Sequence, residues 1–208
     1  MGAGEPSLKQ GISIYAYSAN KSMEKTAFYN SDGDFLIVPH SGTLYVRTLN
    51  GRLTVAPKEI LVIPRGIKFS IDVTGEIKGW VAEVFGHHLG LPELGPIGAN
   101  GMANPGDFEF PTAWFEDKKE EWLIYNKYIG EMFEAKCKFS PYDVVGWKGN
   151  YSPFKYNLEL YNTIGSISYD HPDPSIFTVL TVKSAMEGYL WHYLGLPPWT
   201  SLSSLLAG

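Results

Sequence analysis

The stretch from Phe35 to Phe85 constrains the fold most, because it consists of six short apolar segments with turn residues between them. Asn50-Gly51 predicts a tight hairpin, since this pair readily takes the positive φ that such turns need. Strands of this length and spacing favour a sandwich or barrel over alternating strands and helices. The expected strands cover residues 35–38, 43–48, 52–55, 60–63, 68–73 and 78–85. We therefore predict a mainly β fold, a jelly roll or β-sandwich.

After the sixth strand the pattern is less regular. Residues 91–111 are dominated by Gly, Pro and Asn, which predicts a long ordered loop or a crossover between domains. The charged run 116–121 is expected to open one short helix, while 125–139 fits either a helix or a strand. Residues 176–182 are typical of a β-branched strand. From about Glu187 the chain lacks charge, and we do not expect this tail to end a folded domain.

Charge and cysteine content exclude several classes of function. The chain has 17 Lys and Arg against 22 Asp and Glu and no basic run, whereas nucleic-acid binding needs a concentrated basic face. The apolar tail is split by Pro197-Pro198, so no membrane span is expected. A single cysteine, Cys137, excludes an intrachain disulfide and a multi-cysteine zinc site. Because no secretory signal is present at the start, we expect a cytoplasmic protein.

Five histidines are available as metal ligands: His40, His87, His88, His171 and His192. A metal-binding cupin carries a His-x-His pair on one strand, because residues two apart share a face of the sheet. The segments 34–38 and 43–48 carry no such pair, and Phe69 stands where a later histidine ligand is expected. The sequence therefore predicts a cupin-like barrel that serves as a scaffold without a metal.

His171-Pro172-Asp173 is the remaining candidate for chemistry. A His-x-Asp pair with a distant histidine is the ligand pattern of non-haem Fe(II) oxygenases, and His192 is the histidine downstream. The prolines around Asp173 make the segment a rigid turn. His171 is alternatively a lone general base or substrate contact, or the segment is a turn in which Asp170 caps local amides. The residues alone leave these interpretations open.

Five long motifs, in order along the chain, resemble the homogentisate 1,2-dioxygenase family. They are Phe28–Pro39, Arg65–Val73, Leu94–Pro105, Trp147–Asn157 and Asp170–Thr181. The third, Leu-Gly-Pro-Ile-Gly-Ala-Asn-Gly-Met-Ala-Asn-Pro, is very similar to the family's long loop. The resemblance extends from Gly2 to about Ser184. Two departures are Lys148, where the family tends to have histidine, and a shortened loop at Asp117–Trp122.

The resemblance implies an Fe(II)-dependent dioxygenase that uses O₂ to open the ring of homogentisate, giving maleylacetoacetate in tyrosine and phenylalanine catabolism. It places the substrate-binding and base histidine on His171 and implies that Asp173 is not an iron ligand. The family's ligands, two histidines and a glutamate, lie further downstream in a segment that we do not find here. We therefore expect this chain to bind no iron and to be inactive. The family forms trimers that pair into hexamers.

The same resemblance divides the chain into three parts. These are a partial N-terminal jelly-roll domain (1–160), the start of a C-terminal cupin-like catalytic domain (161–187) and a divergent tail (188–208). About a hundred further residues are expected before Gly2, judged from usual domain size. The jelly roll is then incomplete, with unpaired sheet edges that promote aggregation. Two alternatives remain: a catalytically dead scaffold or assembly module for full-length subunits, and a metal-free cupin-type binding protein.

Overall fold

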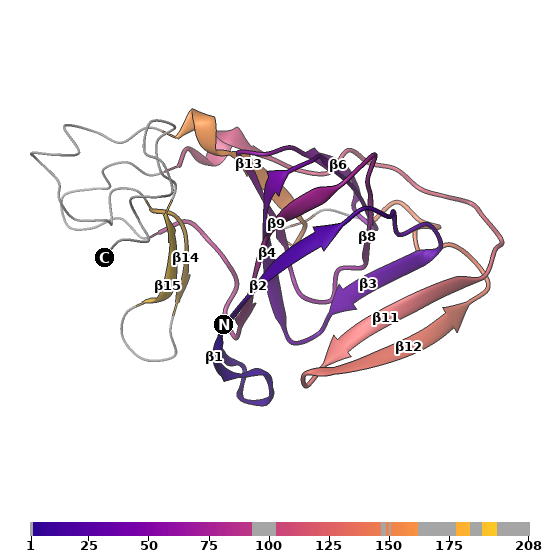
Figure 1. Ribbon diagram of the computed structural model, residues 1–208, viewed down its shortest axis with the longest axis horizontal. Helices are drawn as coiled ribbons and strands as arrows, with labels where there is room; N and C mark the ends of the chain where they lie inside the picture. Colours follow the sequence, from indigo (N-terminus) through magenta and orange to yellow (C-terminus); the bar gives the residue numbers. More distant parts are fainter. Residues whose placement is uncertain are drawn as a thin grey trace, which may run out of the picture. The chain divides into compact units, whose positions relative to one another are not determined.

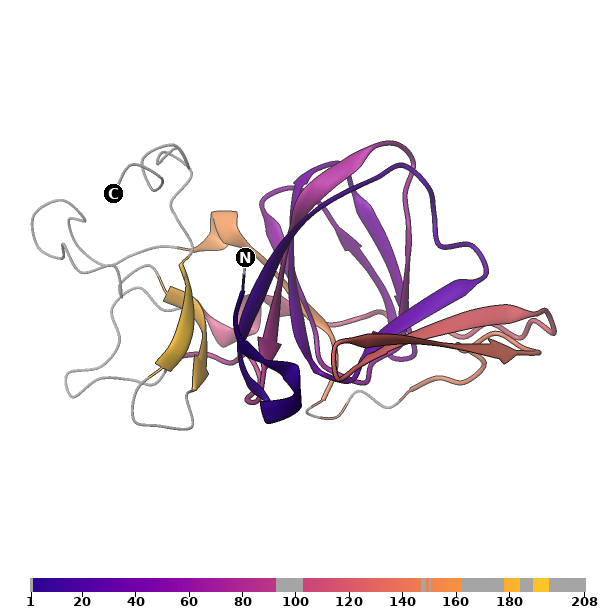
Figure 2. The same cartoon turned by 60° about the horizontal axis from the view of Figure 1, so that its bottom comes forward.

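Eight consecutive strands are divided between two sheets that face each other (Figures 1 and 2). The computed structural model describes residues 2–92, 103–146, 149, 151–161 and 178–183, and the backbone of 189–194. The eight strands are β2 (Gln10–Ala19), β3 (Thr26–Asn30), β4 (Gly33–Ser41), β5 (Leu44–Thr48), β6 (Gly51–Val55), β7 (Glu59–Ile63), β8 (Phe69–Asp72) and β9 (Ile77–Phe85). One sheet contains the order β2-β9-β4-β7 and the other β3-β8-β5-β6. This division is that of a jelly roll, so the predicted mainly β, cupin-like fold is confirmed.

Further strands extend both sheets. β1 (Gly2–Glu5) pairs with β2, while β13 (Phe154–Asn157) and β10 (Phe108–Glu109) continue the first sheet beyond β7. In the second sheet, β11 (Trp122–Tyr128) lies parallel to β3 and antiparallel to β12 (Glu131–Cys137), which forms an edge. β14 (Thr178–Lys183) and β15 (Tyr189–Leu194) form a separate antiparallel pair. The described helical segments are short 3-10 turns: η1 (Pro6–Leu8), η2 (Pro105–Asp107) and η3 (Leu158–Leu160).

The chain divides into two units. The first consists of residues 1–88 with 109–156 and contains the jelly roll, and the second consists of 89–108 with 157–208. Within the second unit, Gly90 forms a backbone bridge with Thr181 of β14. Across the described residues, no helix has both the length and the apolar character to cross a membrane.

The core between the sheets is built from alternate residues of each strand. In β5, Leu44 and Val46 are buried while Tyr45 is exposed, and in β6 Leu53 and Val55 are buried on either side of an exposed Thr54. Successive side chains of a strand point to opposite faces, so one set fills the interior. The buried cluster consists of Ile37, Leu44, Val46, Leu53, Val55, Leu61, Ile63, Phe69 and Ile77.

β4 continues through Pro39 to Ser41, beyond the end predicted at Val38. Proline has no N–H to donate, and it is therefore unfavourable inside a sheet. Here β4 pairs with β7 only over Phe35–Ile37, whereas its pairing with β9 continues to Ser41 with an irregularity after Pro39. Pro39 thus lies beyond the part of β4 that pairs with β7. The sheet therefore tolerates the missing N–H group of the proline.

The helix expected over 116–121 is not formed, so that prediction was wrong. The segment is extended and bonds to the chain that returns from β12. The Glu116 N–H donates to the Tyr142 carbonyl (2.7 Å), and the Ser140 N–H donates to the Lys118 carbonyl (2.9 Å). These bonds satisfy the backbone groups that a helix would otherwise pair internally.

The ambiguous stretch 125–139 belongs to a hairpin. β11 and β12 pair from Trp122 with Cys137 to Tyr128 with Glu131, and the turn between them is Ile129-Gly130. Both turn residues have positive φ, +52° and +76°. Two positive φ values match the twist of a two-residue hairpin turn. The choice between helix and strand, which the spacing of apolar residues left open, is therefore decided in favour of strands.

The predicted hairpin between β5 and β6 is present. Its turn is Leu49-Asn50, and Gly51, with φ of +134°, opens β6 opposite Thr48. A Cβ at Gly51 would lie 2.1 Å from the carbonyl oxygen of Thr112. That oxygen also accepts a hydrogen bond from the Arg52 N–H (2.8 Å). Both the dihedral and the close approach of Thr112 therefore require glycine.

Replacing Gly51 with alanine is expected to lower the free energy of unfolding by about 1–3 kcal/mol, the usual cost of a strained backbone position. Urea denaturation followed by tryptophan fluorescence measures this. Gly75→Ala is the matched control, because a Cβ added at Gly75 would meet no atom within 4 Å and the residue has no positive φ. Equal effects of the two substitutions would contradict the role given to Gly51.

Candidate functional site

The residue with the strongest sequence signal lies outside the described residues. His171 and Asp173 both fall within 162–177, which the structure does not describe. His192 lies in β15 with its backbone opposite Thr181, and its side chain is outside the described set. The role of His171, whether as base or as metal ligand, therefore stays a prediction.

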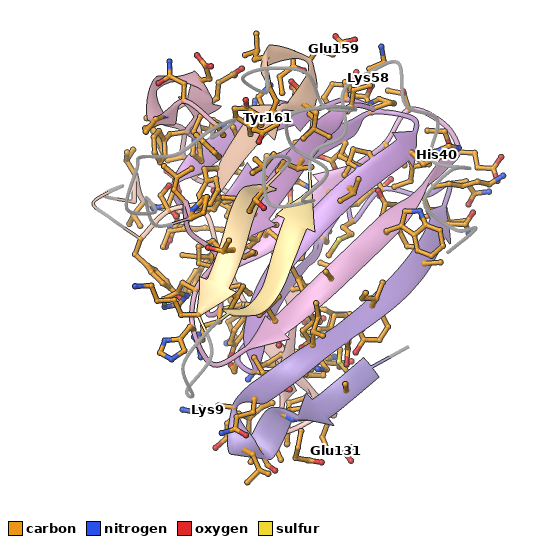
Figure 3. All side chains as sticks on the ribbon, turned by 90° about the vertical axis from the view of Figure 1, so that its left-hand side faces the viewer. Lys9, His40, Lys58, Glu131, Glu159 and Tyr161 are labelled. Atoms are coloured by element: carbon orange, nitrogen blue, oxygen red, sulfur yellow. The ribbon has the colours of Figure 1, made fainter. Side chains whose placement is uncertain are left out.

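Three histidines lie in the jelly-roll unit. His40 is exposed on β4, at the opposite end of the sheet from Lys9 (Figure 3), and His87 and His88 follow β9 in a bend. The described residues contain no group of three His, Cys, Asp or Glu side chains placed to hold a metal ion.

His88 is held by a buried carboxylate. Its Nδ1 lies 2.8 Å from Oδ2 of Asp34, whose side chain is 1% exposed. Asp34 also accepts a hydrogen bond from the Arg65 N–H (3.0 Å), and the ring of His88 meets Tyr151 edge to face at 5.2 Å. This orients the imidazole at the rim of the sheet, but no second nucleophile or ligand converges on it among the described residues.

The interior of the jelly roll contains a cavity of about 320 Å³. It lies between the first sheet, which contributes β2, β4 and β9, and the second sheet, which contributes β5 and β8. The lining residues are Tyr15, Tyr17, Ala19, Lys21, Met23, Phe35, Ile37, Leu44, Phe69, Ile71, Val73, Ile77 and Val81. The wall is apolar except for Lys21 and the two tyrosine hydroxyls. This hollow is the clearest candidate for a binding site in the described part of the chain.

Phe69, the residue at the expected ligand position, lies in a cluster of three phenylalanine rings. Phe69, at the predicted ligand position, meets Phe28 at 5.6 Å and Phe35 at 6.4 Å between ring centroids, both edge to face. Phe28 stacks on Phe35 at 5.9 Å. Fe(II) needs nitrogen, oxygen or sulfur ligands, so this interior does not fit an iron ion and suits an apolar occupant.

A buried charge borders the cavity. Glu83 of β9 is fully buried and accepts hydrogen bonds from Asn30 Nδ2 (2.7 Å), from Tyr15 Oη (3.0 Å) and from Lys127 Nζ (2.5 Å). Tyr15 also lines the cavity. A carboxylate is tolerated at such depth only when it is paired and hydrogen-bonded, and three donors meet that requirement here.

Lys127 bridges this carboxylate to a second one. Its Nζ is 3.3 Å from Asp32 Oδ2, and Asp32 in turn accepts hydrogen bonds from the N–H groups of Ile129 (2.6 Å) and Gly130 (2.9 Å). Burial by itself lowers the pKa of Lys127, but the hydrogen bonds and charges of Glu83 and Asp32 outweigh it, so the pKa is raised above the ordinary 10.5. The ammonium therefore stays charged throughout the physiological range.

Sequence reasoning did not identify Glu83, Lys127 or the cavity. One signal was available for Glu83, because it shares a strand face with Val81, Gly79 and Ile77, in a segment whose alternation predicts an inward face. The hydrogen-bond partners of Glu83 had no sequence signal, because they come from three other strands of the chain. Cys137, the single cysteine, packs against the buried cluster around Trp122 and Tyr142.

A two-sheet jelly roll with a hollow apolar interior places the chain in the cupin-like class of β proteins. Comparison with sequence families is more specific. The family described as "Homogentisate 1,2-dioxygenase N-terminal" matches residues 1–158, and "Homogentisate 1,2-dioxygenase C-terminal" matches residues 159–200. The chain belongs to the homogentisate 1,2-dioxygenase family, as its motifs indicated.

Individual relatives support this assignment. Homogentisate 1,2-dioxygenase of Caenorhabditis elegans is 57% identical over 90% of this chain and 43% of the relative. The Homo sapiens protein of the same name is 53% identical over 90% of this chain and 42% of the relative. The chain thus spans less than half the length of these curated relatives. The match to the C-terminal family extends past Glu187, and the division at 160 and 187 stays a prediction.

Among solved structures, a cupin-2 domain containing protein from Shewanella frigidimarina aligns with 35% of this chain and 70% of its own, at 19% identity and a TM-score of 0.32. At that score the likeness adds nothing to the fold assignment, which stands on the sheet topology.

Replacing Lys127 with methionine is expected to lower the free energy of unfolding by about 3–5 kcal/mol, because it leaves the Glu83 carboxylate buried and uncompensated. Urea denaturation at neutral pH provides the measurement. Lys25→Met is the control. Lys25 pairs with Glu120 at 3.0 Å, but both side chains are largely exposed, and such pairs contribute less than about 1 kcal/mol.

The pH dependence of the free energy of unfolding provides a second test of the coupling between Lys127 and Glu83. A lysine whose folded-state pKa is raised stabilises the fold fully below 10.5, and that stabilisation is lost as pH rises through the higher folded value. Denaturation titrations from about pH 8 to about pH 11.5 should show an alkaline loss in the parent chain that is reduced in Lys127→Met. Identical pH profiles would contradict the coupling of Lys127 to Glu83.

Proposed function

We propose that this chain forms part of a homogentisate 1,2-dioxygenase, the enzyme that opens the ring of homogentisate with O₂ to give maleylacetoacetate. The observation that carries the proposal is the 57% identity, over 90% of the chain, with a relative of that name. The ordered matches to the N-terminal and then the C-terminal family support it. Homogentisate and O₂ as substrates, trimers paired into hexamers and a cytoplasmic location belong to the same proposal.

Within this proposal, His171 is the base that orients homogentisate and accepts a phenolic proton. Support comes from the motif Asp170–Phe177, which lies inside the match to the C-terminal family. A neutral imidazole is suited to the role, because its ordinary pKa lies near neutrality. Asp173, two residues on, is proposed to shape the turn and not to bind metal.

The family implies Fe(II), and the jelly-roll interior does not accept it. Phe69 stands at the expected ligand position within a cluster of three phenylalanine rings, and the cavity wall is apolar except for Lys21 and the two tyrosine hydroxyls. We therefore assign the barrel a scaffold role in the dioxygenase and place no step of the reaction in it.

A role in assembly is the second candidate, and one observation favours it. β12 is an edge strand whose residues are exposed along almost its whole length, including Met132 and Phe133 at 57% and 54%. Exposed edge strands with apolar side chains pair readily with other chains. Such an edge suits a module that joins subunits, whether or not the chain takes part in catalysis.

The chain by itself is expected to bind no stoichiometric Fe(II) and to consume no oxygen with homogentisate. Fe(II) in this class of enzyme needs three protein ligands that leave positions open for substrate and O₂, and the barrel offers an aromatic and aliphatic surface. Metal analysis of the purified chain and an oxygen electrode provide the readouts. The Caenorhabditis elegans relative, assayed in parallel, is the positive control. Oxygen uptake that depends on added Fe(II) would overturn the expectation.

The role of His171 is testable in an active chimera, in which this chain replaces the matching part of the Caenorhabditis elegans relative. His171→Ala is expected to lower kcat by roughly 10²- to 10⁴-fold, the usual contribution of a general base, while the iron content stays unchanged. Asp173→Asn is the matched control and should keep both iron and most of the activity. Loss of iron in either variant would establish the two residues as a ligand pair. If His171→Ala changes neither rate nor iron, His171 is a turn residue.

A further inference from the structure

The cavity in the jelly roll is larger than close packing leaves by chance. Protein interiors hold few voids bigger than a water molecule, whereas this one measures about 320 Å³, at the lower end of the range for small-molecule sites. Its wall of Phe35, Phe69, Ile71 and Val81 favours an apolar body, and the edges of the two rings suit a flat or chain-like one.

One polar atom in the wall has no partner. The hydroxyl of Tyr17, a residue of β2 that lines the cavity, is buried and forms no hydrogen bond. Burial raises its pKa to about 12, so at neutral pH the group is a protonated donor. An unsatisfied buried hydroxyl is unfavourable by about 1–3 kcal/mol. Its oxygen has almost no accessible surface, so an occupant of the cavity meets the ring of Tyr17 and not its hydroxyl.

A positive charge marks the opening. Lys21 follows β2 directly, lines the cavity and is itself exposed to solvent, so the cavity opens where this side chain lies. No carboxylate of the described residues forms an ion pair with it, in contrast to Lys25 in the same segment, which pairs with Glu120. Met23, beside it in the wall, is a flexible side chain that adapts to different shapes.

We propose that the jelly-roll cavity binds a small monocarboxylate with an apolar body, which inserts the body between the sheets and presents its carboxylate to Lys21 at the opening. The site is separate from the proposed dioxygenase chemistry, because it uses neither iron nor His171. Aryl-alkanoic acids and medium-chain fatty acids share this chemistry, and the choice between them is left to the experiment.

The test is isothermal titration and thermal melting of the full 208-residue chain with 4-phenylbutanoate and, separately, decanoate. At least one acid should bind with 1:1 stoichiometry and raise the melting temperature. The acid that binds more tightly shows whether the site prefers an aromatic or an aliphatic body. 4-Phenylbutan-1-ol and 4-phenylbutylamine, which lack the negative charge, should bind more weakly than the acid. No binding of either acid at millimolar concentration, or tighter binding of the amine, would overturn the proposal.

Variants separate the parts of the site. Lys21→Gln should weaken the acids about threefold to fivefold, as for a solvent-exposed ion pair, and leave the alcohol unchanged, while Lys25→Gln should alter neither. Tyr17→Phe should leave the acid affinity unchanged and raise the melting temperature of the free chain, since it removes an unpartnered hydroxyl that an occupant does not reach. Val81→Phe fills the cavity and should abolish binding. If that variant does not fold, the Lys21 variant decides the question, and unchanged acid affinity in Lys21→Gln contradicts the proposal.

Discussion

The arrangement of the jelly-roll unit depends on one carboxylate that no water reaches. Glu83 is on a central strand of the first sheet, and its compensating groups come from both sheets: Tyr15 from β2, Asn30 from β3 and Lys127 from β11. Each of those side chains must be held in place for the charge to be tolerated. The network therefore fixes how the two sheets meet at this end and where the β11–β12 hairpin attaches. Because Tyr15 bonds to Glu83 and lines the cavity, the network also fixes part of the cavity wall.

Much of the fold was predictable because its information is local. Turn residues and period-two alternation between Phe35 and Phe85 marked six strands, and all six are present with small shifts at their ends. The helix expected over 116–121 was wrong, and the choice between helix and strand over 125–139 was left open, both for equally local reasons. Ile129 is a β-branched residue with φ of +52°, and such residues rarely turn a hairpin, so Gly130 alone was a weak signal for the turn. A charged run before it resembled the first turn of a helix.

The site was less predictable, because its parts are brought together by pairing between distant strands. Phe69 was predicted to stand at a ligand position from its place in the cupin-like motif. The structure shows that its ring packs against Phe28 and Phe35. The orientation of His88 by Asp34 joins residues 54 apart, and the contacts of Glu83 span similar distances. Only the completed topology reveals such clusters. His171 was found from its motif and resemblance alone, and its geometry lies outside the described residues.

The parallel pairing of β11 with β3 has a consequence for the order in which the protein folds. Asp32, next to the end of β3, receives the amides of Ile129 and Gly130 across 97 and 98 residues of chain. Contacts of such long range form late, because the intervening chain must first be ordered. The hairpin itself is local and closes in about 1–10 μs. We therefore expect the hairpin to form early and to dock on β3 late, when Asp32 and Glu83 already lie in place to receive its amides and Lys127.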